Sequence, residues 1–171
     1  MKNIFLVGLP SSGKTTLGKQ LARYIRYRFV DTDVLIVKEE GMSINDIFAK
    51  KGEPYFREAE ARILRAIRPD SKLIVATGGG IPYFHNNMNY IKENGISVFL
   101  DVAPEEIVER IQRHASNDRP TYRKQDTQLL ENLKQKYHDR LPFYSQADFT
   151  LSGESLHIKQ LLELLQEVVV V

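Results

Sequence analysis

The stretch Gly8-Leu9-Pro10-Ser11-Ser12-Gly13-Lys14-Thr15 determines how the rest of this chain is interpreted. It matches the pattern G-x-x-x-x-G-K-[ST], whose backbone N–H groups surround phosphate oxygens. In such a loop Lys14 would reach the β- and γ-phosphates, and the Thr15 hydroxyl would ligate Mg²⁺. The sequence therefore predicts a site for a nucleoside triphosphate or a closely similar molecule. The residues expected to bind it are Gly8, Pro10, Ser11, Ser12, Gly13, Lys14, Thr15 and Thr16.

The sequence on both sides of this loop supports the same interpretation. Residues 4–7 are an uninterrupted apolar run, which is typical of a strand buried on both faces of a parallel sheet. After the loop, Leu17, Leu21 and Ile25 recur at helical spacing. A strand, a glycine-containing loop and a helix in this order direct a helix N-terminus at phosphates. A chance occurrence of the two glycines is therefore a poor explanation.

The composition is that of an ordinary soluble domain. The 171 residues are 42% hydrophobic and 27% charged, and the formal net charge of +2 is too small to indicate nucleic-acid binding. There are no cysteines, which excludes disulfides and thiolate metal sites. We find no targeting pattern and no apolar run of membrane-spanning length. The expectation is one cytoplasmic domain, 1–171, that acts as a monomer without membrane or nucleic-acid partners.

Strand and helix patterns alternate along the chain. Strands are predicted at 4–7, 28–30, 73–76, 96–100 and 149–151. Helices are predicted from the loop to residue 25 and at 34–40, 43–51, 55–67, 84–93, 104–114, 128–144 and 156–168. This alternation predicts a three-layer α/β/α P-loop fold with a five-stranded parallel sheet. Residues 115–126 lack apolar periodicity and are polar and basic, so we expect them to form a mobile lid.

Two carboxylates follow the second predicted strand. Asp31 and Asp33 come at its carboxyl end, the edge where ligands bind in open α/β sheets. Since residues i and i+2 of a strand share a face, both side chains are expected to point into one cleft. One carboxylate would hold Mg²⁺ and the other would orient or deprotonate a hydroxyl nucleophile; we assign Asp31 to the metal and Asp33 to the substrate. Helix capping is the alternative for an aspartate here, and both roles can hold together.

Three further features are less specific when taken singly. Gly78-Gly79-Gly80 follows the third predicted strand and indicates either a close approach of the backbone to a ligand or a flexible turn. Arg57 and Arg140 lie on predicted helices, and a guanidinium suits bidentate binding of a carboxylate, although an exposed arginine is the simpler reading of each. Glu60, three residues after Arg57, is spaced to hold the orientation of that guanidinium.

In their order and spacing, these motifs resemble the shikimate kinases over essentially the whole chain. The matching elements are the loop 8–15, Asp31-Thr32-Asp33, Phe56-Arg57-Glu58 with Glu60, Thr77-Gly78-Gly79-Gly80, Asp118-Arg119-Pro120, Arg140-Leu141-Pro142-Phe143-Tyr144 and Ala147-Asp148. The resemblance implies a nucleoside monophosphate kinase-like fold and an enzyme that uses ATP and Mg²⁺. It implies transfer of the γ-phosphoryl group to the 3-hydroxyl of shikimate, in aromatic amino-acid biosynthesis.

The same resemblance assigns residues to the acceptor. It implies that Asp33 contacts the shikimate hydroxyls and that Arg57 and Arg140 bind the shikimate carboxylate. The backbone of Gly78, Gly79 and Gly80 would line the site, with Phe48 and Phe56 as apolar walls. Residues 32–62 would then form the substrate-binding helical segment.

For the nucleotide, the resemblance implies that Arg119 of the lid reaches the phosphates. Arg113 or Arg110 would pack on the adenine. With Lys14 and Asp33, Arg119 makes up the expected catalytic set. Closure of the lid over both ligands would exclude water and suppress ATP hydrolysis.

The chain departs from the family pattern in its phosphate loop and its lid. Ser11 stands where another glycine is common, and Thr121-Tyr122 follows Arg119-Pro120 where leucines are usual. The segment 151–155 lacks an arginine often found there. These differences concern the nucleotide pocket and the packing of the lid rather than the reaction.

Two other functions are weighed against this one. A kinase with another acceptor, such as gluconate or a nucleoside monophosphate, would not require Asp31-Thr32-Asp33, Arg57 and the glycine triplet together. A non-catalytic regulatory module that keeps the fold is the second alternative. The intact Lys14, Asp33 and Arg119 argue against it, since a decayed site should show losses there.

Overall fold

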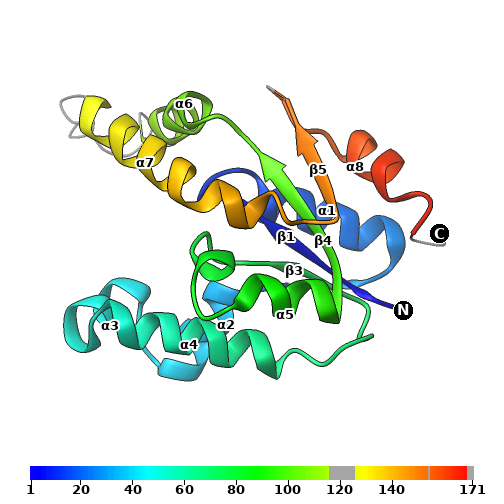
Figure 1. The fold of residues 1–171 in the computed structure, drawn as a ribbon, viewed down its shortest axis with the longest axis horizontal. Coiled ribbons are helices and arrows are strands. Elements are labelled where there is room, and N and C mark those ends of the chain that lie inside the picture. Colours follow the sequence, from blue (N-terminus) through cyan, green and yellow to red (C-terminus); the bar gives the residue numbers. More distant parts are fainter. Residues whose placement is uncertain (116–125, 154, 169–171) are drawn as a thin grey trace.

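The computed structural model describes residues 1–115, 126–153 and 155–168, and its centre is a five-stranded parallel sheet (Figure 1). The strands are β1 (Asn3–Val7), β2 (Arg28–Asp31), β3 (Leu73–Ala76), β4 (Gly95–Asp101) and β5 (Phe149–Ser152). Their order across the sheet is β2-β3-β1-β4-β5, and each neighbouring pair is parallel. The carboxyl ends of the strands therefore lie at one edge, which is where ligands bind in open sheets of this kind.

Helices cover both faces of the sheet. They are α1 (Lys14–Ile25), α2 (Thr32–Glu40), α3 (Ile44–Lys51), α4 (Glu53–Ala66), α5 (Asn87–Asn94), α6 (Pro104–Ala115), α7 (Asp126–Tyr144) and α8 (Ile158–Leu165). Ile4 and Leu6 of β1 face the core under α1 and α8, whereas Phe5 and Val7 face the core under α4, α5, α6 and α7. Burial on both faces explains the apolar run 4–7, and the predicted three-layer fold is confirmed.

A smaller core holds α2, α3 and α4 together at one side of the molecule (Figure 1). Its buried residues are Ile36, Ile47, Phe56, Ala59 and Ile63. Ion pairs reinforce this group on the surface, where Arg62 of α4 binds Glu39 and Glu40 of α2. These three helices supply the part of the site that faces the β2 edge of the sheet.

The boundaries of several elements differ from those expected. Glu53 and Pro54 begin α4 instead of separating two helices, because proline is tolerated in a first helical turn. A short 3₁₀ helix, Ile81–Tyr83, precedes α5, which begins at Asn87 rather than at residue 84. The last helix is shorter at both ends than the predicted range 156–168. Within the described part of the chain, no helix is both long and apolar enough to cross a membrane.

Candidate active site

Three segments converge at the carboxyl edge of the sheet. The phosphate loop follows β1, Asp31 ends β2, and Thr77 with the glycine triplet follows β3. The strands β2, β3 and β1 are neighbours in the sheet, so these segments lie side by side. The tertiary structure thus brings together groups from three separate segments of the sequence.

The phosphate loop is packed tightly enough to need its first glycine. A Cβ at Gly8 would lie 2.7 Å from the Leu100 carbonyl oxygen of the neighbouring strand β4, and its φ of +147° disfavours other residues. Gly13 caps the N-terminus of α1 in a left-handed conformation. The loop therefore presents the start of α1 to a cavity, as a phosphate-binding loop requires.

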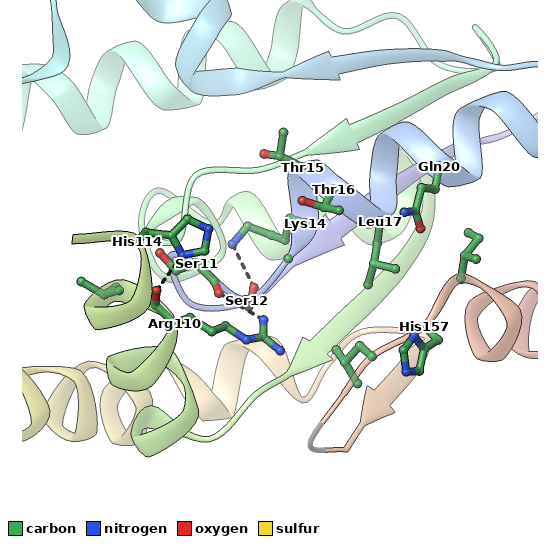
Figure 2. Close-up of a pocket in the computed structure, with 14 residues that line it drawn as sticks. Ser11, Ser12, Lys14, Thr15, Thr16, Leu17, Gln20, Arg110, His114 and His157 are labelled. Carbon is green, nitrogen blue, oxygen red and sulfur yellow. Dashed lines mark hydrogen bonds between the residues drawn. The ribbon is translucent and has the colours of Figure 1, made fainter. Parts of the chain in front are cut away.

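A cavity of about 750 Å³ lies in front of this loop (Figure 2). One wall is the loop and the first turns of α1, including Thr16 and Gln20. Figure 2 shows Arg110 and His114 of α6 bordering it on one side and His157, before α8, on another. A space of this size, with apolar walls and a phosphate loop at one end, is large enough for a nucleotide.

The two arginines considered for the adenine lie in different places. Arg110 lines the cavity, donates to the Ser11 carbonyl over 3.3 Å and pairs with Glu106. Arg113 pairs with Glu109 on the exposed side of α6 and is not among the residues that line this cavity. Of the two alternatives, only Arg110 lines this cavity in the described structure, and the assignment of either arginine to the adenine stays a prediction.

Lys14 is held inside the loop by its own backbone. Its ammonium donates to the carbonyls of Gly8 (2.9 Å) and Leu9 (2.7 Å) and to the Ser12 hydroxyl. Burial lowers the pKa of Lys14 from 10.5 to about 8, while Asp33 and Asp31 raise this pKa and Arg140 lowers it further. A buried ammonium without a full counter-charge is prepared to bind an anion such as a phosphate.

The predicted metal residues lie next to each other. The Thr15 hydroxyl donates to Oδ2 of Asp31 over 3.0 Å. Oδ1 of Asp31 accepts from the backbone N–H of Asp33, so Asp31 also caps α2, as the alternative considered from the sequence proposed. A hydroxyl and a carboxylate form a hard-oxygen donor pair that fits Mg²⁺, which takes its other ligands from phosphates and water.

Asp33 reaches the site by a different route from the one expected. The expectation that Asp31 and Asp33 share a strand face is wrong, because β2 ends at Asp31 and Asp33 lies in the first turn of α2. Burial raises the pKa of Asp33, Asp31 raises it further, and Lys14 and Arg57 oppose the rise. A carboxylate between Lys14 and Arg57 with a raised pKa suits a proton acceptor.

The glycine triplet is packed between charged side chains. A Cβ at Gly78 would lie 2.7 Å from Glu60 and 3.0 Å from Asp33, and the Gly78 N–H donates to the buried Thr32 hydroxyl. A Cβ at Gly79 would lie 2.9 Å from Pro10 and 3.2 Å from Arg140. A close approach of the backbone to other atoms therefore explains the triplet better than a flexible turn does. The atoms approached belong to side chains around the site.

Arg57 is fixed on every side. Its guanidinium pairs with Glu60 (2.8 Å) and Glu53 (3.0 Å) and lies 4.3 Å from the centre of the Phe84 ring. Glu60 is 1% exposed, so this pair is largely removed from water. The predicted contact of Glu60 with Arg57 is confirmed. The packing of Arg57 on the Phe84 ring was not predicted, because no sequence pattern indicates it.

The other residues assigned to the acceptor come from α3, α4 and α7. Phe48 is exposed and its ring packs at 4.7 Å against that of Phe56, which is buried. Arg140 is 8% exposed and its guanidinium lies over Gly79. Helix α7 thus brings the Arg140 guanidinium to Gly79, while the Arg57 guanidinium lies beside Gly80.

We expect Gly80→Ala to weaken binding at this site. The added methyl would fall on the Arg57 guanidinium, which must then leave its place between Glu60 and Phe84. The KM for the acceptor should rise about tenfold, which corresponds to one displaced charged contact. Gly41→Ala is the control: its φ of +66° strains an alanine and should lower the stability, but nothing lies within 4 Å of its Cβ position, so the KM should stay unchanged. An unchanged KM in Gly80→Ala would contradict the tight packing of Arg57.

Ser11 shows why a glycine suits its position. Its φ of +62° is left-handed, which disfavours a non-glycine residue by about 1–2 kcal/mol. Ser11→Gly relieves this strain but adds freedom to the unfolded chain, so the free energy of unfolding should change by less than about 1 kcal/mol. The KM for ATP should stay within about threefold. A larger rise would show that the Ser11 hydroxyl itself binds the nucleotide.

Some residues of the site carried no assignment from the sequence. Thr32, Phe84, Lys136 and Tyr144 contact or face the assigned residues, and Gln20 and His157 line the nucleotide cavity. Their side chains come from helices and loops whose proximity only the fold creates. The predicted catalytic Arg119 and most of the predicted lid, residues 116–125, lie outside the described residues.

A phosphate loop that opens onto a second, cation-lined site on a parallel sheet is the arrangement of a P-loop kinase acting on a small molecule. Comparisons with known proteins give the family. A sequence model of the family described as shikimate kinase matches residues 10–169. The chain belongs to the shikimate kinase family, whose members are ATP-dependent kinases.

Individual relatives agree along nearly the full length. A shikimate kinase of Sulfurihydrogenibium sp. (strain YO3AOP1) is 42% identical over 163 residues, which cover 95% of this chain and 95% of the relative. The crystal structure of shikimate kinase from Bacteroides thetaiotaomicron superposes with a TM-score of 0.87 at 34% identity, covering 96% of this chain and 98% of that one. Shikimate kinase from Acinetobacter baumannii in complex with shikimate gives 0.81 at 31% identity, covering 98% and 92%.

Proposed function

We propose that this chain transfers the γ-phosphoryl group of ATP to the 3-hydroxyl of shikimate. One side of the site would bind the nucleotide and the other would bind the acceptor. Phosphoryl transfer depends on positioning and charge neutralisation more than on covalent catalysis. The observation that carries the proposal is the place of Asp33, whose pKa responds to Lys14 on the nucleotide side and to Arg57 on the acceptor side. An acceptor hydroxyl beside Asp33 would lie between the two.

The nucleotide would occupy the cavity in front of α1. The loop N–H groups and the N-terminus of α1 would bind the phosphates, and Lys14 would exchange its carbonyl partners for phosphate oxygens. The base would lie toward Arg110 and the residues before α8. Thr15 and Asp31 would hold Mg²⁺, which supplies charge neutralisation at the phosphates when bound.

The acceptor would bind between Asp33, Arg57, Arg140 and the glycine triplet. Two guanidiniums beside neighbouring glycines, Arg140 at Gly79 and Arg57 at Gly80, fit the single carboxylate of shikimate. Asp33 would align the attacking hydroxyl and accept its proton. Phe48 and Phe56 would form the apolar wall beside the ring, as the resemblance implies.

The remaining parts of the proposal concern groups that the described residues do not include. Arg119 would come in from the lid 115–126 and neutralise the transferring phosphoryl group. The monomeric state, the cytoplasmic location and the single domain 1–171 stay predictions.

A coupled assay of ADP release tests the proposal. With ATP and Mg²⁺, release should depend on shikimate and should not appear with gluconate or a nucleoside monophosphate. Release that shikimate leaves unchanged would indicate another acceptor or a simple ATPase. Binding of ATP without any release would instead favour a regulatory module.

A further inference from the structure

Tyr144 occupies an unusual position for a core aromatic residue. It is the largest of the fully buried side chains in the described structure, and its ring packs at 5.1 Å against Phe99 of β4. Its hydroxyl donates to the carbonyl oxygen of Gly79 over 2.5 Å. A buried tyrosine needs such a partner, but this partner is the middle residue of the glycine triplet.

The same hydroxyl also meets Arg140. These two residues are four apart on α7, so they lie on one face of the helix, and the Arg140 guanidinium lowers the pKa of the Tyr144 hydroxyl, as a cation close to it does. The guanidinium itself lies over Gly79, close to where a Cβ would stand. Tyr144 therefore links a side chain and a backbone carbonyl that both border the acceptor site.

Two features of this region would leave the end of α7 and the Arg140 guanidinium poorly fixed without the Tyr144 hydroxyl. Pro142 lies inside α7 between Arg140 and Tyr144 and has no N–H to donate, so the last turn lacks one backbone hydrogen bond. Arg140 also shares its surroundings with two other cations, Lys136 and Arg57. Repulsion among them would push the guanidinium outward, whereas the oxygen of the nearby buried hydroxyl attracts it.

The hydroxyl remains a donor under working conditions. Burial raises the pKa of Tyr144 to about 12, although Arg140 and Arg57 lower it in part. Tyr144 therefore stays protonated at neutral pH and can donate to Gly79 while its oxygen attracts the Arg140 guanidinium.

We propose that Tyr144 is a positioning residue for the phosphoryl acceptor, because its hydroxyl fixes the Gly79 carbonyl and the Arg140 guanidinium in the arrangement that binds the acceptor's carboxylate. This inference rests on the role proposed above for Arg140. Without the hydroxyl, both groups sample other positions, and only a fraction of the enzyme is ready to bind. The effect should appear in shikimate binding and not in ATP binding.

Tyr144→Phe removes the hydroxyl and keeps the ring. The Kd of shikimate, measured by calorimetry on the full chain, should rise about fivefold, which is the loss of one hydrogen-bonded contact. The Kd of ATP should stay within about twofold. Tyr137→Phe is the matched control, since it removes a hydroxyl from the same helix that donates to Asp101 instead.

A second control separates positioning from packing. Phe99→Leu weakens the packing of the Tyr144 ring and leaves both hydroxyl contacts. It should lower the melting temperature and leave the Kd of shikimate within about twofold. If Phe99→Leu weakens shikimate binding fivefold, packing controls the site and the inference fails, even where Tyr144→Phe does not fold.

The remaining outcomes are distinct from a failure of the proposed function. If Tyr144→Phe binds shikimate as the unchanged chain does while Arg140→Ala binds it poorly, the positioning role is wrong and the acceptor site stands. If Arg140→Ala also binds shikimate normally, the proposed role of Arg140 is wrong as well, and with it this inference.

Discussion

Asp33→Asn should abolish most phosphoryl transfer while ATP still binds. Asparagine has the same shape but cannot accept the proton of the attacking hydroxyl, so kcat should fall by about 10² to 10⁴. The nucleotide cavity is lined by other residues, and the Kd of ATP should therefore stay within about twofold. Single-turnover and binding measurements distinguish the two quantities. Asp46→Asn, in the exposed first turn of α3, is the control.

The same variant should also differ in stability. Burial and Asp31 raise the pKa of Asp33, so the folded state binds more protons than the unfolded state between pH 3.8 and that raised pKa. Stability of the unchanged chain therefore falls as the pH rises through this window, and Asp33→Asn lacks that loss. Above the window the variant should be the more stable protein, and its advantage in free energy of unfolding should shrink in acid.

For catalysis, turnover of Asp33→Asn within about tenfold of the unchanged chain would refute the catalytic role.

Lys14→Met should lose transfer and show a characteristic dependence of stability on pH. The ammonium is the loop's only side-chain cation within the described residues 8–15, and its removal leaves the β- and γ-phosphates without their charge partner. Activity should fall by at least about 10². Lys19→Met, which removes an exposed lysine from the same helix, should keep the activity.

The stability effect follows from the pKa of Lys14. Because the pKa of Lys14 is about 8 in the folded state and 10.5 for an ordinary lysine, the unfolded state binds more protons between these values, and stability rises with pH across the window. The interval corresponds to about 3 kcal/mol of the free energy of unfolding, of which about 2 kcal/mol falls between pH 7 and pH 9.5.

Urea unfolding of both proteins at several pH values measures this effect. The free energy of unfolding of the unchanged chain should rise relative to that of Lys14→Met from pH 7 to pH 9.5, since the methionine variant has no ammonium to deprotonate. Comparison of the two proteins cancels the other groups that titrate in this range. A constant difference across the range would contradict the burial of an unneutralised charge in the loop.

The two variants describe one property of the site. Lys14 and Asp33 both have pKa values displaced by burial in the direction that disfavours their charged forms. Such groups lower the stability of the empty enzyme and become useful when phosphates and a hydroxyl arrive. Burial of charge at the expense of stability is common in sites where function and stability compete.

Sequence patterns predicted the fold well because each carries its own physical signal. The apolar run 4–7 and the glycines of the loop act locally, and the structure has a strand and a phosphate loop followed by a helix at these places. Errors occurred where neighbouring signals compete. Pro54 can either end one helix or begin another, and only packing against α2 and α3 decided that it begins α4.

The sequence by itself determined the phosphate loop and the order of strands and helices along the chain. It also identified Thr15, Asp31, Asp33 and Arg57 as candidates for the site, because these predictions depend on residue type and spacing within single segments. Only the tertiary structure decided what those residues meet. It placed Asp33 on a helix, and it brought Arg110 to Ser11 and Tyr144 to Gly79, contacts that join segments far apart in the chain. The physical reason is that a side chain's burial and partners are set by the packing of whole helices on the sheet, which no local pattern encodes.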